Sequence, residues 1–313
     1  MKKPVIVVLL VLLVFISSCA PIPTQSINPP VSTTPAVTET QPGQMPTVTE
    51  ATQGLAVSFD TFKDLMLTAQ EMRKQVQLVD GKWTETQADG SIQMVNLDTR
   101  FATGDLNEDG VDDAALLVAE SMGGTGVFYS LTVLINNNGV FEQKASAFID
   151  DRPIIHSIEI NNGEVVLNVN VHGLNDPMID PTMKLTKNYR LIENRLVTFR
   201  QTQWLQDGQS REINITSPEN GSGVSGEVTL VGGMPIAPFE NTLLVQVFDE
   251  KNTFSFVQST MVDAADVGLP ATFSVTIPLD KFKAGDRVIL QLVEVSMADG
   301  SNMAIDSVIV IIK

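Results

Sequence analysis

The sequence predicts a mainly β protein, in which an α+β middle domain is followed by a C-terminal β-sandwich. Short apolar runs with a period of two recur between residues 75 and 312, which is the pattern of half-buried strands. Polar pairs such as Asp80-Gly81 and Asn162-Gly163 separate these runs and are typical of tight hairpin turns. Only residues 60–73, at the start of the folded part, show apolar residues at helical spacing.

The first nineteen residues follow the order of a secretory signal. Lys2 and Lys3 precede an unbroken apolar run at 5–15, and small residues then lead to a cysteine. The run is too short for a bilayer, which needs about 20 apolar residues, so residues 1–18 are predicted to be a signal peptide. Residues 16–19, Ile-Ser-Ser-Cys, resemble the bacterial lipobox, which has an aliphatic residue, two small residues and a cysteine.

The lipobox resemblance implies that the thiol of Cys19 receives a diacylglyceryl group and that Cys19 becomes the new N-terminus. Cys19 is the single cysteine of the chain, and a secreted protein without disulfides has little other use for one thiol there. An ordinary signal peptide that happens to contain a cysteine is the alternative. We therefore expect an extracytoplasmic lipoprotein, anchored stably to the bacterial cell membrane by acyl chains on Cys19.

The net charge limits the classes of partner. The formal charge is −17, and loss of Lys2 and Lys3 with the signal makes the mature chain more acidic still. Proteins that bind nucleic acids carry a basic surface, so a nucleic-acid partner is excluded. The acidity suits an exported protein that must stay soluble and one that collects divalent cations.

Residues 19–54 are predicted to be a disordered tether. They are rich in Pro, Thr, Ser and Gln, with only scattered apolar residues. Such a segment cannot bury enough apolar surface to offset the entropy lost on ordering. We expect an extended spacer that holds the folded part away from the membrane.

Residues 55–206 are predicted to be an α+β domain. A short helix between Asp60 and Arg73 is indicated by the helical spacing of Phe59, Phe62, Leu65, Met66 and Ala69. Period-two patterns then predict an antiparallel sheet. Its expected strands are 75–79, 83–86, 92–95, 114–119, 129–136, 157–160, 165–171, 188–191 and 195–203.

A polar stretch at 207–212 precedes a second all-β region, residues 213–313. About one hundred residues with seven strands and polar turns are the size and pattern of an immunoglobulin-like sandwich. The expected strands are 213–216, 227–232, 241–249, 254–260, 271–277, 287–295 and 305–312.

Several segments of this region carry a family resemblance: Ile215–Gly221, Val224–Gly226, Pro238–Leu243, Gln246–Asp249, Glu294–Ser296, Asp299–Ser301 and the final strand Ile305–Ile312. In this order they resemble the immunoglobulin-like domain associated with bacterial spore germination. The resemblance implies a sandwich used for binding or assembly, and it does not imply catalysis. The segment at 262–269 is longer than the usual pattern, which leaves the geometry of that loop open.

One acidic loop carries a candidate cation site. Residues 105–113 read Asp-Leu-Asn-Glu-Asp-Gly-Val-Asp-Asp, with side-chain oxygens at alternate positions and a glycine that allows a tight turn. The loop is similar to the calcium loops of FG-GAP and integrin-type repeats and of dockerin-like modules. Because Leu116 stands where an EF-hand needs a bidentate Glu, an EF-hand is excluded. The expected Ca²⁺ ligands are the side chains of Asp105, Asn107, Asp109 and Asp113 and the carbonyl of Val111.

The same loop has a metal-free interpretation, in which its acidic side chains form hydrogen-bonded Asx turns. Even with calcium, we expect a structural rather than a catalytic site. The loop occurs once, so a propeller of repeated blades is not supported.

The sequence favours binding over catalysis. Only His156 and His172 are available as imidazoles, and no nucleophile motif accompanies them. The leading hypothesis is a lipid-anchored cell-surface binding or envelope-assembly protein without catalytic activity, with an envelope protein or a glycan as partner. The alternatives are a lipid-anchored extracytoplasmic hydrolase, acting on carbohydrate with the sandwich as an accessory module, and a spacer with no specific ligand.

Overall fold

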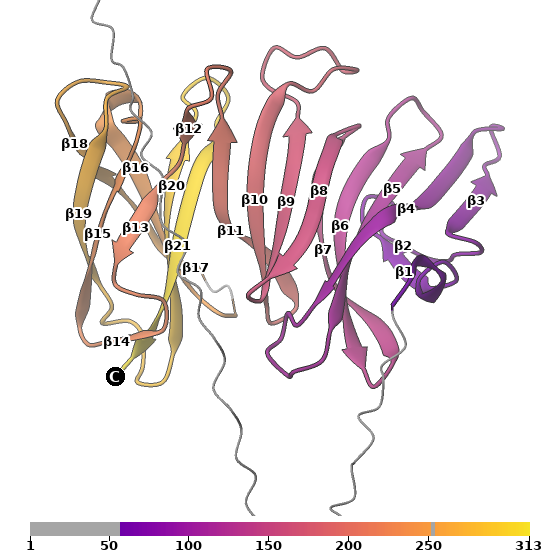
Figure 1. Ribbon diagram of the computed structural model, residues 1–313, viewed down its shortest axis with the longest axis horizontal. Helices are drawn as coiled ribbons and strands as arrows, with labels where there is room; N and C mark the ends of the chain where they lie inside the picture. Colours follow the sequence, from indigo (N-terminus) through magenta and orange to yellow (C-terminus); the bar gives the residue numbers. More distant parts are fainter. Residues whose placement is uncertain (1–56, 252–253) are drawn as a thin grey trace, which may run out of the picture. The chain divides into compact units, whose positions relative to one another are not determined.

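The computed structural model describes residues 57–251 and 254–313 (Figure 1). The predicted signal peptide, Cys19 and the tether lie outside the described residues. Residues Leu55–Lys313 form one compact unit. Within the part of the chain that is described, no helix is both long enough and apolar enough to cross a membrane.

The predicted mainly β class is confirmed, but the predicted helix at its start is wrong. After a single 3-10 turn, η1 (Phe59–Thr61), the chain forms a hairpin of β1 (Met66–Ala69) and β2 (Lys74–Gln77). Leu67 and Ala69 are buried while their neighbours on β1 are exposed. Burial therefore alternates with the period of two of a strand and not with the 3.6-residue period of a helix. The described residues contain no α-helix.

A five-stranded antiparallel sheet follows, in the order β3-β4-β5-β6-β7. Its central strand β5 is buried on both faces, because Ala115 and Leu117 face one apolar cluster while Leu116 and Val118 face another. The second cluster is the one that the β1–β2 hairpin covers. The strands are β3 (Lys82–Thr86), β4 (Ile92–Gly104), β5 (Asp113–Met122), β6 (Phe128–Asn137) and β7 (Val140–Asp151).

A second sheet packs on the other face of β5 and β6. Strand β9 alternates strictly, so that Val165, Leu167 and Val169 enter the shared core and the residues between them face outward. Figure 1 shows the first strands of this sheet side by side. They are β8 (Ile154–Asn161), β9 (Glu164–Val171), β10 (Met183–Ile192) and β11 (Arg195–Trp204), with the short β12 (Ser210–Arg211) paired to β11.

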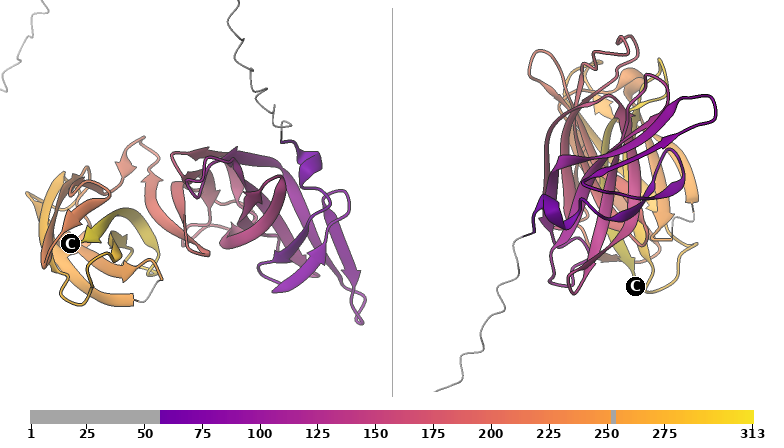
Figure 2. Two further views of the ribbon diagram at one scale, coloured as in Figure 1. Left: turned by 90° about the horizontal axis from the view of Figure 1, so that it is seen from below. Right: turned by 90° about the vertical axis from the view of Figure 1, so that its right-hand side faces the viewer.

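The last third forms a sandwich with its own core. A four-stranded sheet, β13-β15-β19-β18, packs against strands β16, β20 and β21 through one cluster of buried apolar side chains. Seen from below in Figure 2, these strands surround a single interior. They are β13 (Asn214–Ser217), β14 (Ser222–Val224), β15 (Glu227–Met234), β16 (Thr242–Asp249), β17 (Phe254–Met261), β18 (Asp263–Ala264), β19 (Ala271–Pro278), β20 (Arg287–Val295) and β21 (Asn302–Ile312), with the turn η2 (Phe239–Asn241) before β16.

The middle strands and the sandwich share a ten-stranded sheet. Its main order is β17-β16-β20-β21-β11-β10-β9-β8, and the link is a single antiparallel pair, Gln201 on β11 with Ile305 on β21. A small apolar cluster beside it contains Phe199 of β11, Phe248 of β16 and Ile289 of β20. The outer face of the sandwich is therefore partly buried at this junction.

Candidate functional site

The predicted cation loop joins β4 to β5 as a tight connection between antiparallel strands. Glu108 and Gly110 both adopt left-handed backbone conformations, with φ of 63° and 83°. Glycine takes this conformation without steric cost, which explains why the reversal occurs at the Asp-Gly pair.

The side chains of the loop bind its own main chain. Asp105 Oδ2 accepts a hydrogen bond from the Gly110 N–H at 2.8 Å, and Asp109 Oδ1 accepts one from the Val111 N–H at 2.8 Å. Asn107 Oδ1 accepts from the Asp109 N–H at 3.1 Å, while its amide donates to Asp109 Oδ2 at 2.9 Å. These are the Asx turns of the metal-free interpretation, and they bring three predicted ligands together.

Asp113 occupies a different environment from the other predicted ligands. It is 0% exposed, and its two oxygens accept hydrogen bonds from the N–H groups of Leu106 at 3.0 Å and Asn136 at 2.9 Å. Burial raises the pKa of the Asp113 carboxyl, the two N–H donors oppose that rise, and the nearby negative charges of Asp109 and Asp105 add to it. Asp113 thus ties the base of the loop to β6.

This geometry does not by itself form a cation site. No group of three or more His, Cys, Asp or Glu side chains in the described part of the chain is arranged to hold a metal ion. Each Asp113 oxygen already accepts one main-chain N–H, so Asp113 could offer a cation only its remaining lone pairs. Calcium binding by Asp105, Asn107, Asp109, Val111 and Asp113 stays a prediction.

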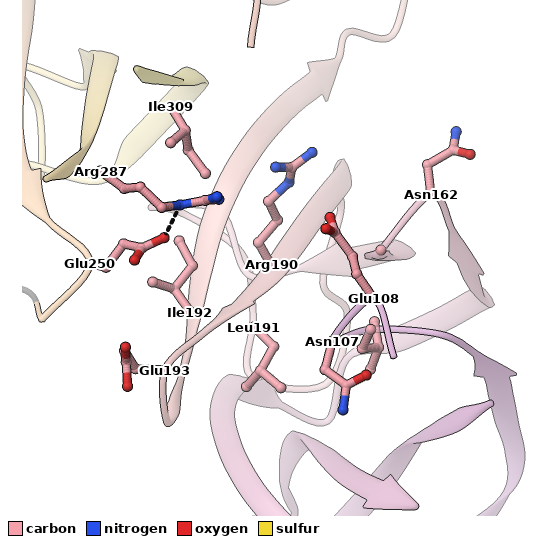
Figure 3. Close-up of a pocket in the computed structure, with 12 residues that line it drawn as sticks. Asn107, Glu108, Asn162, Arg190, Leu191, Ile192, Glu193, Glu250, Arg287 and Ile309 are labelled. Atoms are coloured by element: carbon pink, nitrogen blue, oxygen red, sulfur yellow. Dashed lines mark ion pairs between the residues drawn. The ribbon is translucent and has the colours of Figure 1, made fainter. Parts of the chain in front are cut away.

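A pocket of about 260 Å³ lies beside the acidic loop (Figure 3). Asn107 and Glu108 of the loop line it, together with the two cations Arg190 and Arg287. Each cation is already held by a carboxylate, because Arg190 donates to Glu164 at 2.7 Å and Arg287 pairs with Glu250. The pocket is therefore poorly suited to an anionic ligand.

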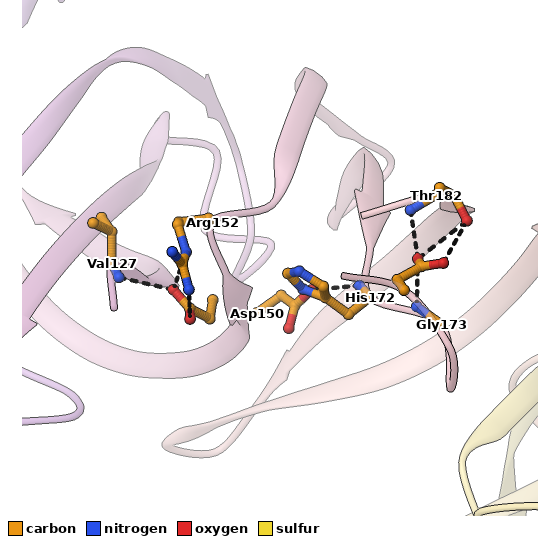
Figure 4. Close-up of polar contacts among 8 residues, drawn as sticks. Val127, Asp150, Arg152, His172, Gly173 and Thr182 are labelled. Atoms are coloured by element: carbon orange, nitrogen blue, oxygen red, sulfur yellow. Dashed lines mark hydrogen bonds and ion pairs between the residues drawn. The ribbon is translucent and has the colours of Figure 1, made fainter. Parts of the chain in front are cut away.

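A second polar cluster joins the end of β7 to the loop after β9 (Figure 4). Asp150 Oδ2 accepts a hydrogen bond from the His172 main-chain N–H at 2.6 Å and lies 2.8 Å from its Nδ1. Burial lowers the pKa of His172, but the hydrogen bond and charge of Asp150 outweigh that effect and raise it. Asp176 binds the N–H groups of Gly173 and Thr182, which lower the pKa of its carboxyl and close the loop.

The two histidines lie in separate surroundings. His156 Nε2 is 2.9 Å from Asn170 Oδ1, whereas His172 pairs with Asp150. Among the residues that the structure describes, neither imidazole is hydrogen-bonded to a hydroxyl group. His172 acts as a structural tie in this arrangement.

Glu120 is a buried carboxylate whose role no local sequence pattern indicates. It is 0% exposed near the C-terminal end of β5, and its carboxylate accepts hydrogen bonds from the N–H groups of Gln70 at 2.7 Å, Glu71 at 3.1 Å and Met72 at 3.0 Å. The turn between β1 and β2 is thus organised around one carboxylate. Its role could not be recognised while the segment was expected to be helical.

The comparisons with known proteins concern the last third of the chain. No curated protein matches this chain. Residues 212–301 match the family described as the immunoglobulin-like domain of bacterial spore germination, which covers less than half of the chain. The predicted resemblance of this region is confirmed. Residues 212–301 therefore form an immunoglobulin-like domain of the type associated with bacterial spore germination.

Proposed function

We propose that this protein is a lipid-anchored, extracytoplasmic binding or envelope-assembly protein without catalytic activity. The observation that carries the proposal is the immunoglobulin-like domain at 212–301, a module for binding rather than chemistry. The sandwich to which this domain belongs shares a ten-stranded sheet with the middle region. The two regions would then present their surfaces to a partner as one body.

The anchor is supported by the sequence alone. A secretion signal ends in Ile-Ser-Ser-Cys, and Cys19 is the only thiol in the chain. With acyl chains on Cys19, residues 19–54 would act as a flexible spacer, with a root-mean-square reach of roughly 30–35 Å. That reach would let the folded unit search the envelope near the membrane surface.

The anchoring experiment compares wild type, Cys19→Ala and Ser18→Ala in a bacterial host that processes lipoproteins. Wild type and Ser18→Ala, which keeps a small residue before the cysteine, should incorporate labelled palmitate and sediment with membranes. Cys19→Ala should take up no label and should lose the acyl-mediated membrane attachment. A Cys19→Ala chain that is labelled like wild type would refute the lipid anchor.

The binding half of the proposal needs a separate measurement. The folded unit 55–313 should sediment saturably with isolated bacterial envelopes while releasing no soluble fragments from them. Loss of sedimentation at every protein concentration contradicts a binding role. Sustained release of envelope fragments, abolished by one carboxylate substitution in the middle region, would favour the hydrolase alternative instead.

A further inference from the structure

An open groove crosses the outward face of strands β8 to β11. It has a volume of about 550 Å³ and lies on the side of these strands opposite the core, because its residues alternate with buried Leu167, Val169 and Leu185. Its lining side chains are mainly neutral and polar, with one large aromatic ring. They are His156, Ser157, Asn168, Asn170, Lys184, Thr186 and Trp204.

A continuous chain of side-chain hydrogen bonds runs across the four strands. Trp204 Nε1 on β11 donates to Thr186 Oγ1 on β10 at 3.0 Å, and Thr186 donates to Asn168 Oδ1 on β9 at 2.6 Å. Asn168 Nδ2 then donates to Ser157 Oγ on β8 at 2.8 Å. Each member fixes the next, so the floor of the groove is ordered before any ligand arrives. Three strand spacings of about 4.8 Å make this row roughly 14 Å long.

A second row lies beside the first. The register places Asn170 of β9 opposite Lys184 of β10, and Lys184 opposite Trp204 of β11. His156 joins this row because a register shift between Ile155 and Ser157 turns it onto the groove face, where it contacts Asn170 at 2.9 Å. The hydrogen bonds of the described residues use neither the Asn170 amide nitrogen nor the Lys184 ammonium group.

Trp204 supplies the apolar surface of the groove. It is the last residue of β11 and is 41% exposed, although a tryptophan in a sheet usually buries its ring. Its bond to Thr186 fixes the ring orientation and leaves the ring surface accessible. An aromatic ring held in one orientation can stack against an apolar C–H surface, and the amides and hydroxyls beside it can hydrogen-bond to hydroxyl groups. The groove therefore suits a ligand that has both an apolar C–H face and many hydroxyl groups.

Charge selects among ligand classes. No carboxylate lines the groove, although the chain as a whole carries a formal charge of −17. Lys184 and His156 are the only groups there that can be positive, which is too few for a phosphate-rich polymer. An extended peptide would add along the free edge of β8, whereas the polar rows run across the strands.

We propose that this groove binds a glycan chain of several pyranose residues, with one sugar stacked on Trp204 and hydroxyl groups of the chain paired with the Asn170 amide and Lys184. This inference rests on the proposed binding function and names its ligand class. The row length of roughly 14 Å fits an oligosaccharide better than a single sugar.

The test uses the compact unit 55–313, which contains all of the apolar clusters described above. The chain has two tryptophans, so Trp83→Phe leaves Trp204 as a site-specific fluorophore. The ligands are the hexamer of N-acetylglucosamine, cellohexaose and maltohexaose. Titration with at least one of these three hexamers should give a saturable change in the fluorescence emission of Trp204. In calorimetric titration, Trp204→Ala and Asn170→Ala should each weaken binding at least tenfold, about 1.4 kcal/mol.

Control variants distinguish a loss of glycan binding from a loss of the folded structure. Asn170→Asp keeps the size of the side chain and an oxygen that faces His156, so it should fold normally while binding more weakly. Thr229→Ala removes an exposed cross-strand hydroxyl pair with Thr276 far along the chain and should leave binding unchanged. Melting temperatures of all variants establish that each is folded.

Three results would count against the groove as a glycan site. The first is no saturable response to any of the three hexamers up to about 5 mM, which corresponds to a binding free energy of only about 3 kcal/mol. The second is a response only to a synthetic peptide of residues 20–54, which would make the chain's own tether the occupant. If Trp204→Ala still sediments with envelopes as wild type does, the groove is not the envelope-binding surface, but the proposed binding function still holds. If wild type itself does not sediment with envelopes, the proposed function is refuted.

Discussion

At the scale of single residues, carboxylates in this protein act chiefly by holding main-chain N–H groups. Asp105, Asp109 and Asp176 do so in exposed loops, while Asp113 and Glu120 do so in the interior. A buried main-chain donor without a partner is costly, so one carboxylate can determine the path of a whole loop. The sequence revealed the exposed loops because Asp and Gly recur there, but the buried roles depend on partners distant in the chain.

Glu120 offers a direct measure of this effect. Glu120→Gln removes the negative charge and one of the two oxygens that receive three N–H groups, so the unfolding free energy should fall by about 1–3 kcal/mol. Denaturant titration measures the change, and amide exchange should accelerate at 70–72 first. The control, Glu227→Gln, alters an exposed strand residue and should change little. Equal stability of Glu120→Gln and wild type would show that the turn does not depend on this carboxylate.

Calcium is the second test at this scale. If the loop binds it, about 1 mM Ca²⁺ should raise the melting temperature of the unit 55–313 by a few degrees, through preferential binding to the folded state. Asp109→Ala should abolish the response. Asp89→Ala is the control, because Asp89 forms an Asx turn with Ser91 in another loop. An unchanged melting temperature at millimolar calcium would contradict calcium binding and would mean that hydrogen bonds alone stabilise the loop.

At the scale of elements, the strands were predictable and the opening helix was not. Every expected strand overlaps an observed one, because alternation with polar turns is a local signal. The error at 60–73 arose because Phe62, Leu65 and Ala69 fit a helical spacing as well as a hairpin whose buried side faces β5. Strand β7 was missed because Glu142 and Lys144 interrupt its apolar residues, and only pairing with β6 makes it a strand. The groove was missed for the same reason, since its residues come from four strands.

The tie between β7 and the loop after β9 should make stability depend on pH. The pKa of His172 is raised in the folded state, so its pairing with Asp150 stabilises fully below the ordinary value of about 6.5. That contribution is lost as the pH rises through the raised folded pKa. Melting temperatures between pH 6 and 9 should therefore fall less steeply for His172→Gln than for wild type. Parallel curves for wild type and His172→Gln would argue against the ion pair.

At the scale of the whole molecule, the junction between the middle strands and the sandwich decides whether they behave as one body. Besides its apolar cluster, the junction contains polar side chains that cross between the two regions. Gln291 of β20 donates to the Thr198 carbonyl of β11 at 2.9 Å, and Gln201 of β11 donates to the Asn302 carbonyl at 2.5 Å. Arg200 reaches Asp306 of β21 at 3.1 Å. The sequence placed a boundary at 207–212, but no local pattern could reveal that β11 pairs with a strand one hundred residues later.

Asp306 makes this junction testable through pH. Its carboxyl is almost fully buried, and it accepts the Ile215 N–H at 2.7 Å. Burial raises its pKa, while the Ile215 N–H and the Arg200 charge oppose the rise without cancelling it. A raised folded pKa means that the stabilising contribution is fully present below the ordinary value, about 3.9, and is lost as the pH rises through the folded value.

Asp306→Asn keeps an oxygen for the Ile215 N–H and removes the charge, so this pH-dependent loss should disappear. Relative to wild type, the variant should gain stability as the pH is raised from about 4 to 7, measured by denaturant unfolding at each pH. Comparison with wild type cancels the opposite trend from carboxyls whose pKa is lowered, such as Asp98 and Asp151. Because Arg200 is half exposed, losing its partner should cost little. A stability difference that stays constant across this range would show that burial does not raise the pKa of Asp306 in solution.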